Sequence, residues 1–168
     1  KELTLDIARR LAALLRADGL EVTLTREGDE DLSLDNRAAV ANHVHAALFV
    51  SLHANASRSA AARGAETYLL ANEATDDAAR TTAALENDAA GVRSAAAGGD
   101  SDLSLILWDL AQNQYLAESG RLAESVQKEL NQLAGTKDRG VRQAPFRVLM
   151  GATMPAILVE VGFLTNPE

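Results

Sequence analysis

The chain has 168 residues, of which 47% are hydrophobic and 24% charged, and a formal net charge of −8. This size and composition are typical of a single globular domain with a proper core. The acidic charge excludes an ordinary nucleic-acid partner, because phosphate contacts need clustered Lys and Arg. No apolar run approaches the roughly 20 residues of a membrane span. The absence of cysteine excludes disulfides and thiolate zinc sites.

The first half of the chain predicts alternating helices and strands. Leucines at helical spacing open the chain, and Asp18-Gly19 is a typical helix end. Strict apolar–polar alternation then indicates a half-buried strand, and Ser33 is placed to cap a second helix. This order favours a three-layer αβα domain with a mostly parallel central sheet. The predicted elements are helices over residues 3–18 and 33–45 and strands over residues 20–25, 48–55 and 64–70.

The middle of the chain is predicted to be helical. Residues 73–92 are rich in Ala and charge, and Gly98-Gly99 should break the helix. Two leucine-rich stripes then predict one long helix, or two in line, ending at Gly135. The chain should return to the sheet through Phe146–Leu149 and a last strand over residues 156–163. We interpret residues 1–168 as a single domain with a helical insert over residues 71–120, before the last two strands.

Two apolar runs each carry one ionisable side chain near their end, namely His53 and Glu160. In open α/β sheets ligands bind beyond the carboxyl ends of the strands, so we expect these two groups to meet. The alternative for His53 is a core histidine bonded to a backbone carbonyl. The alternative for Glu160 is a buried ion pair with Arg142 or Arg147.

Three further polar residues lie near these runs. His43 and His45 are two residues apart, so they point in different directions on a helix and are predicted to be a solvated surface pair. Asn55 directly follows the His53 run, and it is either a turn residue or a substrate-binding residue.

Several motifs resemble those of one family, the zinc-dependent N-acetylmuramoyl-L-alanine amidases that cut bacterial peptidoglycan. The order and spacing of the motifs agree over essentially the whole chain. The segments that carry the resemblance are Leu5–Ala8, Leu34–Ala38, Ser51–Asn55, Arg63–Thr67 and Val159–Pro167.

The resemblance implies a zinc ion held by two histidines and a glutamate, with a zinc-bound water that attacks the amide between N-acetylmuramic acid and L-alanine. It makes His53 a zinc ligand and Glu160 the general acid–base. By the same resemblance, the family's first strand and the other two ligands would precede Lys1. We therefore expect an N-terminally incomplete domain that is inactive alone. The alternative is a non-catalytic module that binds peptidoglycan or regulates another protein.

The insert also resembles a feature of some periplasmic members of this family, which divide septa during cell division. In them a helix covers the zinc site and is displaced by an activator protein. Residues 83–87 resemble the Glu-Asn stretch of that helix. The resemblance implies that Glu86 is an inhibitory metal ligand, and the alternative is an exposed helix charge. Trp108 is either an exposed contact for an activator or packed against a loop. The resemblance places the protein in the periplasm or outside the cell.

Overall fold

The computed structural model describes residues 1–57, 59–89, 102–134 and 138–167, with the backbone alone for residues 89, 102–113, 133 and 134. The described strands form one sheet in the order β1-β4-β2-β3. The pairs β1–β4 and β2–β3 are parallel, and β2–β4 is antiparallel. The predicted α/β fold is therefore confirmed, with a mixed sheet in which two of the three pairings are parallel. The strands are β1 (Phe49–Asn55), β2 (Glu66–Leu70), β3 (Val141–Ala144) and β4 (Ala156–Phe163).

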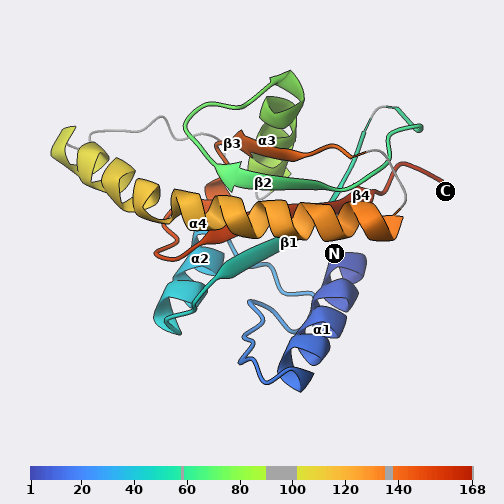
Figure 1. The fold of residues 1–168 in the computed structure, drawn as a ribbon, viewed down its shortest axis with the longest axis horizontal. Coiled ribbons are helices and arrows are strands. Elements are labelled where there is room, and N and C mark those ends of the chain that lie inside the picture. Colours follow the sequence, from blue (N-terminus) through green and yellow to red (C-terminus); the bar gives the residue numbers. More distant parts are fainter. Residues whose placement is uncertain (58, 90–101, 135–137, 168) are drawn as a thin grey trace.

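Helices cover both faces of this sheet, as the three-layer prediction requires (Figure 1). Helix α4 (Asp102–Ala134) packs on one face against a cluster that includes Ile157 and Val159. On the other face, Tyr68 and Leu158 belong to a second cluster, in which the Tyr68 and Phe146 rings lie 4.8 Å apart. That cluster includes side chains from α2 (Leu34–His43), α3 (Asp77–Ala89) and the 3-10 helix η1 (Arg147–Leu149).

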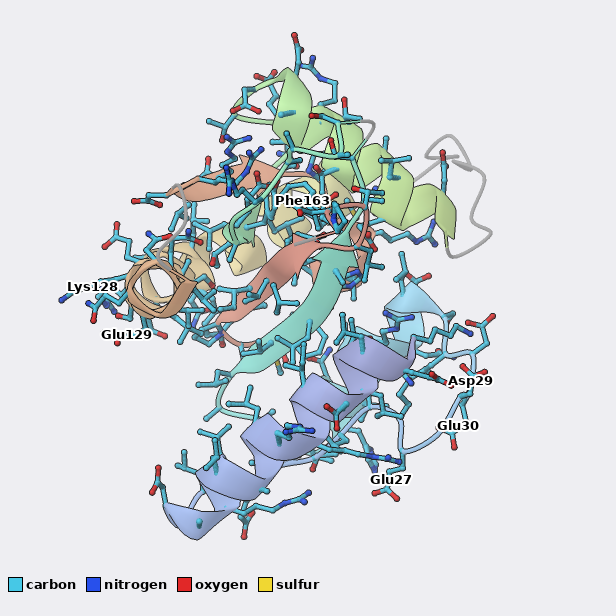
Figure 2. The ribbon with its side chains drawn as sticks, turned by 90° about the vertical axis from the view of Figure 1, so that its right-hand side faces the viewer. Glu27, Asp29, Glu30, Lys128, Glu129 and Phe163 are labelled. Carbon is cyan, nitrogen blue, oxygen red and sulfur yellow. The ribbon has the colours of Figure 1, made fainter. Side chains whose placement is uncertain are left out.

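Helix α1 (Glu2–Ala17) contacts β1 at the edge of the sheet. The loop that follows it carries Glu27, Asp29 and Glu30, which point into solvent in Figure 2. Ser33 caps α2 as predicted, because its hydroxyl accepts a hydrogen bond from Asn36 N at 3.3 Å.

The strand predicted for residues 20–25 is wrong. This segment is irregular, and Leu20 is 55% exposed. A strand needs a hydrogen-bonded neighbour, and in the part of the chain that the structure describes no strand pairs with these residues. The Val22 carbonyl instead accepts a hydrogen bond from Arg16 Nη2 at 2.6 Å. Alternation of side chains alone did not create a strand here.

The strand predicted at Phe146–Leu149 is also wrong. Residues 147–149 form η1, and the strand lies earlier, at Val141–Ala144. Pro145 follows that strand and has no N–H with which to continue a ladder. Phe146, Val148 and Leu149 are all buried, so the apolar run fills the core from a turn rather than alternating across a sheet.

The helices predicted for the middle of the chain are present. The first is α3, and the second is a single helix, α4, which continues through Gly120. The Gly98-Gly99 break and the helix end at Gly135 lie outside the described residues. Among the helices that are described, none is both long and apolar enough to cross a membrane.

Candidate active site

Three ionisable side chains form one row across the sheet. His53 on β1 is in register with Glu160 on β4, and Glu160 is in register with Glu66 on β2. Residues in register on neighbouring strands project to the same face of a sheet. This is the face that carries α3, the helix from which Glu86 reaches the row. The predicted meeting of His53 and Glu160 is confirmed by this register.

His53 uses both of its ring nitrogens. Nδ1 contacts a carboxylate oxygen of Glu86, and Nε2 lies 3.0 Å from the Ser51 hydroxyl. Ser51 is two residues earlier on β1 and therefore projects to the same face. These partners are side chains, whereas the core-histidine alternative required a backbone carbonyl. The hydroxyl and the carboxylate together fix the orientation of the ring.

Glu160 is fully buried, and neither of its carboxylate oxygens has a hydrogen-bond partner among the described residues. Burial raises the pKa of the Glu160 carboxyl to about 8, and the negative charges of Glu86 and Glu66 add to this effect. A buried carboxylate without a partner is costly. Such a group is therefore a candidate for proton transfer or for binding a cation.

The alternative ion pairs of Glu160 are wrong. Arg142 Nη1 lies 3.3 Å from a carboxylate oxygen of Asp76, and Arg147 Nη2 lies 2.8 Å from one of Asp35. Both arginines are therefore engaged with exposed carboxylates of other elements.

Glu66 is the functional candidate that sequence reasoning missed. It is 1% exposed, it accepts a hydrogen bond from the Tyr68 hydroxyl, and it forms an ion pair with Arg139. The Arg139 guanidinium also lies 5.1 Å from the centre of the Phe163 ring. Figure 2 labels Phe163 at the end of β4. A carboxylate inside an apolar strand was the available signal for Glu66 in the sequence.

A β-bulge lies beside the row of ionisable residues. Asn55 is in register with Phe163 although His53 is in register with Glu160, so β4 carries one extra residue in this interval. Bulges bend a strand and re-aim its side chains. The Asn55 carbonyl accepts a hydrogen bond from Leu164 N at 2.8 Å, and its side-chain oxygen accepts one from Ala56 N at 2.7 Å. Asn55 is buried in this turn, and its contact with substrate stays a prediction.

The remaining predicted site residues divide into two groups. Glu86 is half-buried and contacts His53, so the exposed-charge alternative is wrong. His43 and His45 are exposed, as predicted for a surface pair. The side chain of Trp108 lies outside the described residues.

His53, Glu86 and Glu160 offer one imidazole nitrogen and two carboxylate oxygens that all lie within 4.8 Å of one another. Imidazole and carboxylate together suit zinc and similar divalent ions. A cation at this place would also satisfy the unpartnered oxygens of Glu160. The side chains therefore fit a metal ion, and the cluster is a candidate metal site.

Open α/β sheets bind ligands beyond the carboxyl ends of their strands, and a metal ion held by such side chains activates water for hydrolysis. Over its whole length, residues 1–168, the chain matches the family model described as N-acetylmuramoyl-L-alanine amidase. It belongs to this family, as the motifs predicted.

Individual relatives agree with this assignment. The chain is 34% identical to the N-acetylmuramoyl-L-alanine amidase AmiA of Salmonella typhimurium, covering 100% of this chain and 59% of the relative. It is 36% identical to AmiC of Neisseria meningitidis, covering 99% of this chain and 40% of the relative. The chain thus spans about half the length of these curated relatives.

Solved structures give the same result. The N-acetylmuramoyl-L-alanine amidase of Clostridium difficile 630 superposes with a TM-score of 0.66 at 30% identity, covering 99% of this chain and 68% of that one. AmiC2 of Nostoc punctiforme superposes with a TM-score of 0.63 at 30% identity, covering 98% of this chain and 67% of that one. The fold class is therefore that of the amidase structures.

Proposed function

We propose that this chain forms most of the catalytic domain of a zinc-dependent N-acetylmuramoyl-L-alanine amidase. The substrate is peptidoglycan, and the bond cleaved is the amide between N-acetylmuramic acid and the L-alanine of the stem peptide. Family membership supports the reaction. The observation that carries the proposal is the buried Glu160 carboxylate, which is in register with His53 and has no hydrogen-bond partner among the described residues.

Glu160 acts as the general acid–base in this proposal. A pKa of about 8 means that the Glu160 carboxyl exchanges its proton near neutral pH, which suits a group that accepts a proton from water and returns it to the leaving amine. His53 holds the zinc ion, with its ring oriented by Ser51. A bound zinc ion supplies a Lewis acid that polarises the amide carbonyl and makes water more acidic.

The ligand count bears on the activity of these 168 residues alone. A catalytic zinc ion ordinarily has three protein ligands. If Glu160 transfers protons and Glu86 is an inhibitory ligand, His53 is the one ligand of the catalytic set that the candidate cluster contains. We therefore expect weak zinc binding and little turnover from this chain alone, and full activity from the full-length parent protein.

Glu86 is proposed to block the site. Its carboxylate contacts the Nδ1 atom of His53. A carboxylate in this position competes with substrate for the space in front of Glu160. Deleting residues 73–113 from the parent protein should therefore raise basal hydrolysis of peptidoglycan, and unchanged hydrolysis would reject the block. An activator protein that binds the insert over residues 71–120 would relieve it.

The decisive test measures dye release from labelled peptidoglycan by the zinc-loaded parent protein. Glu160→Gln should lower the rate by at least about 100-fold, the usual contribution of a general acid–base. Sedimentation with peptidoglycan should be unchanged in the same variant. Equal rates for the wild type and Glu160→Gln would overturn the assignment. Sedimentation without soluble products from the wild type would favour the alternative of a non-catalytic binding or regulatory module.

Peptidoglycan lies outside the cytoplasmic membrane, so the proposed substrate also supports a location in the periplasm or outside the cell, with a role in cell-wall turnover and cell division. Fractionation of cells that produce the parent protein tests this location. Recovery of the protein in the cytoplasm alone would contradict it.

A further inference from the structure

The residue after Glu86 fastens α3 to another part of the fold. Asn87 Nδ2 donates a hydrogen bond to the Pro145 carbonyl at 2.9 Å, and Arg147 N donates one to Asn87 Oδ1 at 2.9 Å. One side-chain amide thus binds a backbone acceptor and a backbone donor on both sides of Phe146, which is fully buried. This contact joins α3 to the connection between β3 and η1.

That connection is itself fixed to α2. The Arg147 guanidinium forms two parallel hydrogen bonds with the Asp35 carboxylate, with Nε at 2.9 Å from Oδ1 and Nη2 at 2.8 Å from Oδ2. The hydrogen bond from Arg147 holds the pKa of the Asp35 carboxyl below its usual value. Two-point arginine–carboxylate pairs are geometrically specific. The backbone that Asn87 binds is therefore also held in place by α2.

The apolar contacts of α3 with the sheet are small. Among the side chains of α3 that the structure describes, the fully buried apolar ones are Ala79 and Ala83, whereas Leu85, next to Glu86, is 53% exposed. At the beginning of α3 the helix is attached to β3 through Asp76, whose carboxylate binds Arg142 and Ala79 N. At the end that carries Glu86, residues 84–88 include no buried apolar side chain. The Asn87 amide therefore carries much of the attachment of this end.

We propose that Asn87 is the positioning residue that keeps Glu86 on His53. The inference rests on the proposed function, in which Glu86 blocks the site. The hydrogen bonds of Asn87 then set the fraction of molecules in which the site is open. Glu86 is adjacent to Asn87 in a rigid helix, so loss of the amide clamp lets this end of α3 move away from β1. Two hydrogen bonds of ordinary strength correspond to a change of about tenfold in the population of the displaced helix.

The experiment uses Asn87→Ala in the parent protein, with Asp88→Ala as the matched control, since Asp88 is exposed on the same turn. The first measurement is the NMR resonance of the His53 imidazole, assigned with His53→Ala. It should shift in Glu86→Ala, and Asn87→Ala should move it toward that position. Amide hydrogen exchange at the end of α3 should become about tenfold faster. Asp88→Ala should change neither quantity.

The second measurement is basal dye release from peptidoglycan. Asn87→Ala should raise the rate toward that of Glu86→Ala, and the double variant should be no faster than Glu86→Ala, because no block remains to be released. If Asn87→Ala does not fold, Asn87→Asp keeps the acceptor for Arg147 N and removes the donor to Pro145, and it should give an intermediate shift of the resonance.

The outcomes distinguish the positioning role of Asn87 from the block of the site by Glu86. An unchanged His53 resonance and unchanged exchange in the folded Asn87 variants overturn the positioning role. A Glu86→Ala variant that moves the His53 resonance but leaves hydrolysis unchanged overturns the block, and the resonance of Asn87→Ala still decides whether Asn87 positions Glu86.

Discussion

Glu66 and Glu160 lie directly opposite each other on β2 and β4, and both are buried. Glu66 is bound by Arg139 and Tyr68, whereas the carboxylate oxygens of Glu160 have no partner in the described ranges of the chain. The sheet thus neutralises one carboxylate and leaves its neighbour available for chemistry. Different environments of two nearby carboxyl groups are typical of sites that use acid–base catalysis.

The first prediction concerns stability as a function of pH. The pKa of the Glu160 carboxyl rises from 4.5 to about 8 on folding, so between these values the folded state binds more protons than the unfolded state. The free energy of unfolding of the metal-free protein should therefore fall as pH rises through this window, by up to about 1.4 kcal/mol per pH unit.

Urea unfolding in the presence of a chelator, at pH values from about 5 to 8, measures this slope. Glu160→Gln should make the curve flatter, because the titrating group is gone. Glu129→Gln is the control, since Glu129 is exposed on α4 (Figure 2). A slope that Glu160→Gln leaves unchanged would show that another group is responsible.

The second prediction concerns the Arg139–Glu66 pair. Arg139→Ala leaves the buried Glu66 carboxylate without its cation, so the free energy of unfolding should fall by about 3–5 kcal/mol. Glu66→Gln in the same background should recover part of the loss, because the amide carries no charge. Arg142→Ala is the matched control, since its partner Asp76 is 44% exposed and the expected loss is below about 1 kcal/mol. Equal losses in the two arginine variants would contradict this account.

The sequence was sufficient for the residues that depend on local pattern. His53 and Glu160 each lie near the end of an apolar run, and the rule that ligands bind beyond the carboxyl ends of strands is enough to predict that they meet. Ser33 was predicted as a helix cap from its position before an apolar-periodic segment. These inferences need only neighbours within one element.

The parts that failed depend on partners distant in the sequence. The alternation at Leu20–Thr25 is real, but a strand also requires a neighbour, and the sequence does not state which segments pair. Glu66 reaches Glu160 only through the register of β2 and β4. Asn87 binds the backbone at Pro145 and Arg147, about sixty residues away. No local periodicity encodes such contacts.

The third prediction concerns metal binding. Zinc should raise the thermal unfolding midpoint of the parent protein, because a ligand that binds only the folded state stabilises it. His53→Ala should abolish this increase, and His43→Ala should leave it intact, since His43 is exposed on α2. Thermal unfolding with and without zinc checks both variants. The same zinc-dependent increase in His53→Ala and in the wild type would exclude His53 as a ligand.

The last prediction concerns Ser51, whose hydroxyl lies 3.0 Å from His53 Nε2. With Nε2 bound to this hydroxyl, Nδ1 is the nitrogen that contacts Glu86 and is left for a metal ion. Ser51→Ala frees the ring to rotate, and the loss of such an orienting partner typically lowers metal affinity by about 10- to 100-fold. Zinc titration against a competing chelator measures the change in the parent protein. Ser33→Ala is the control, because it removes a helix cap and should cost about 1 kcal/mol of stability without changing zinc affinity. Unchanged zinc affinity in Ser51→Ala would mean that the Glu86 contact alone orients His53.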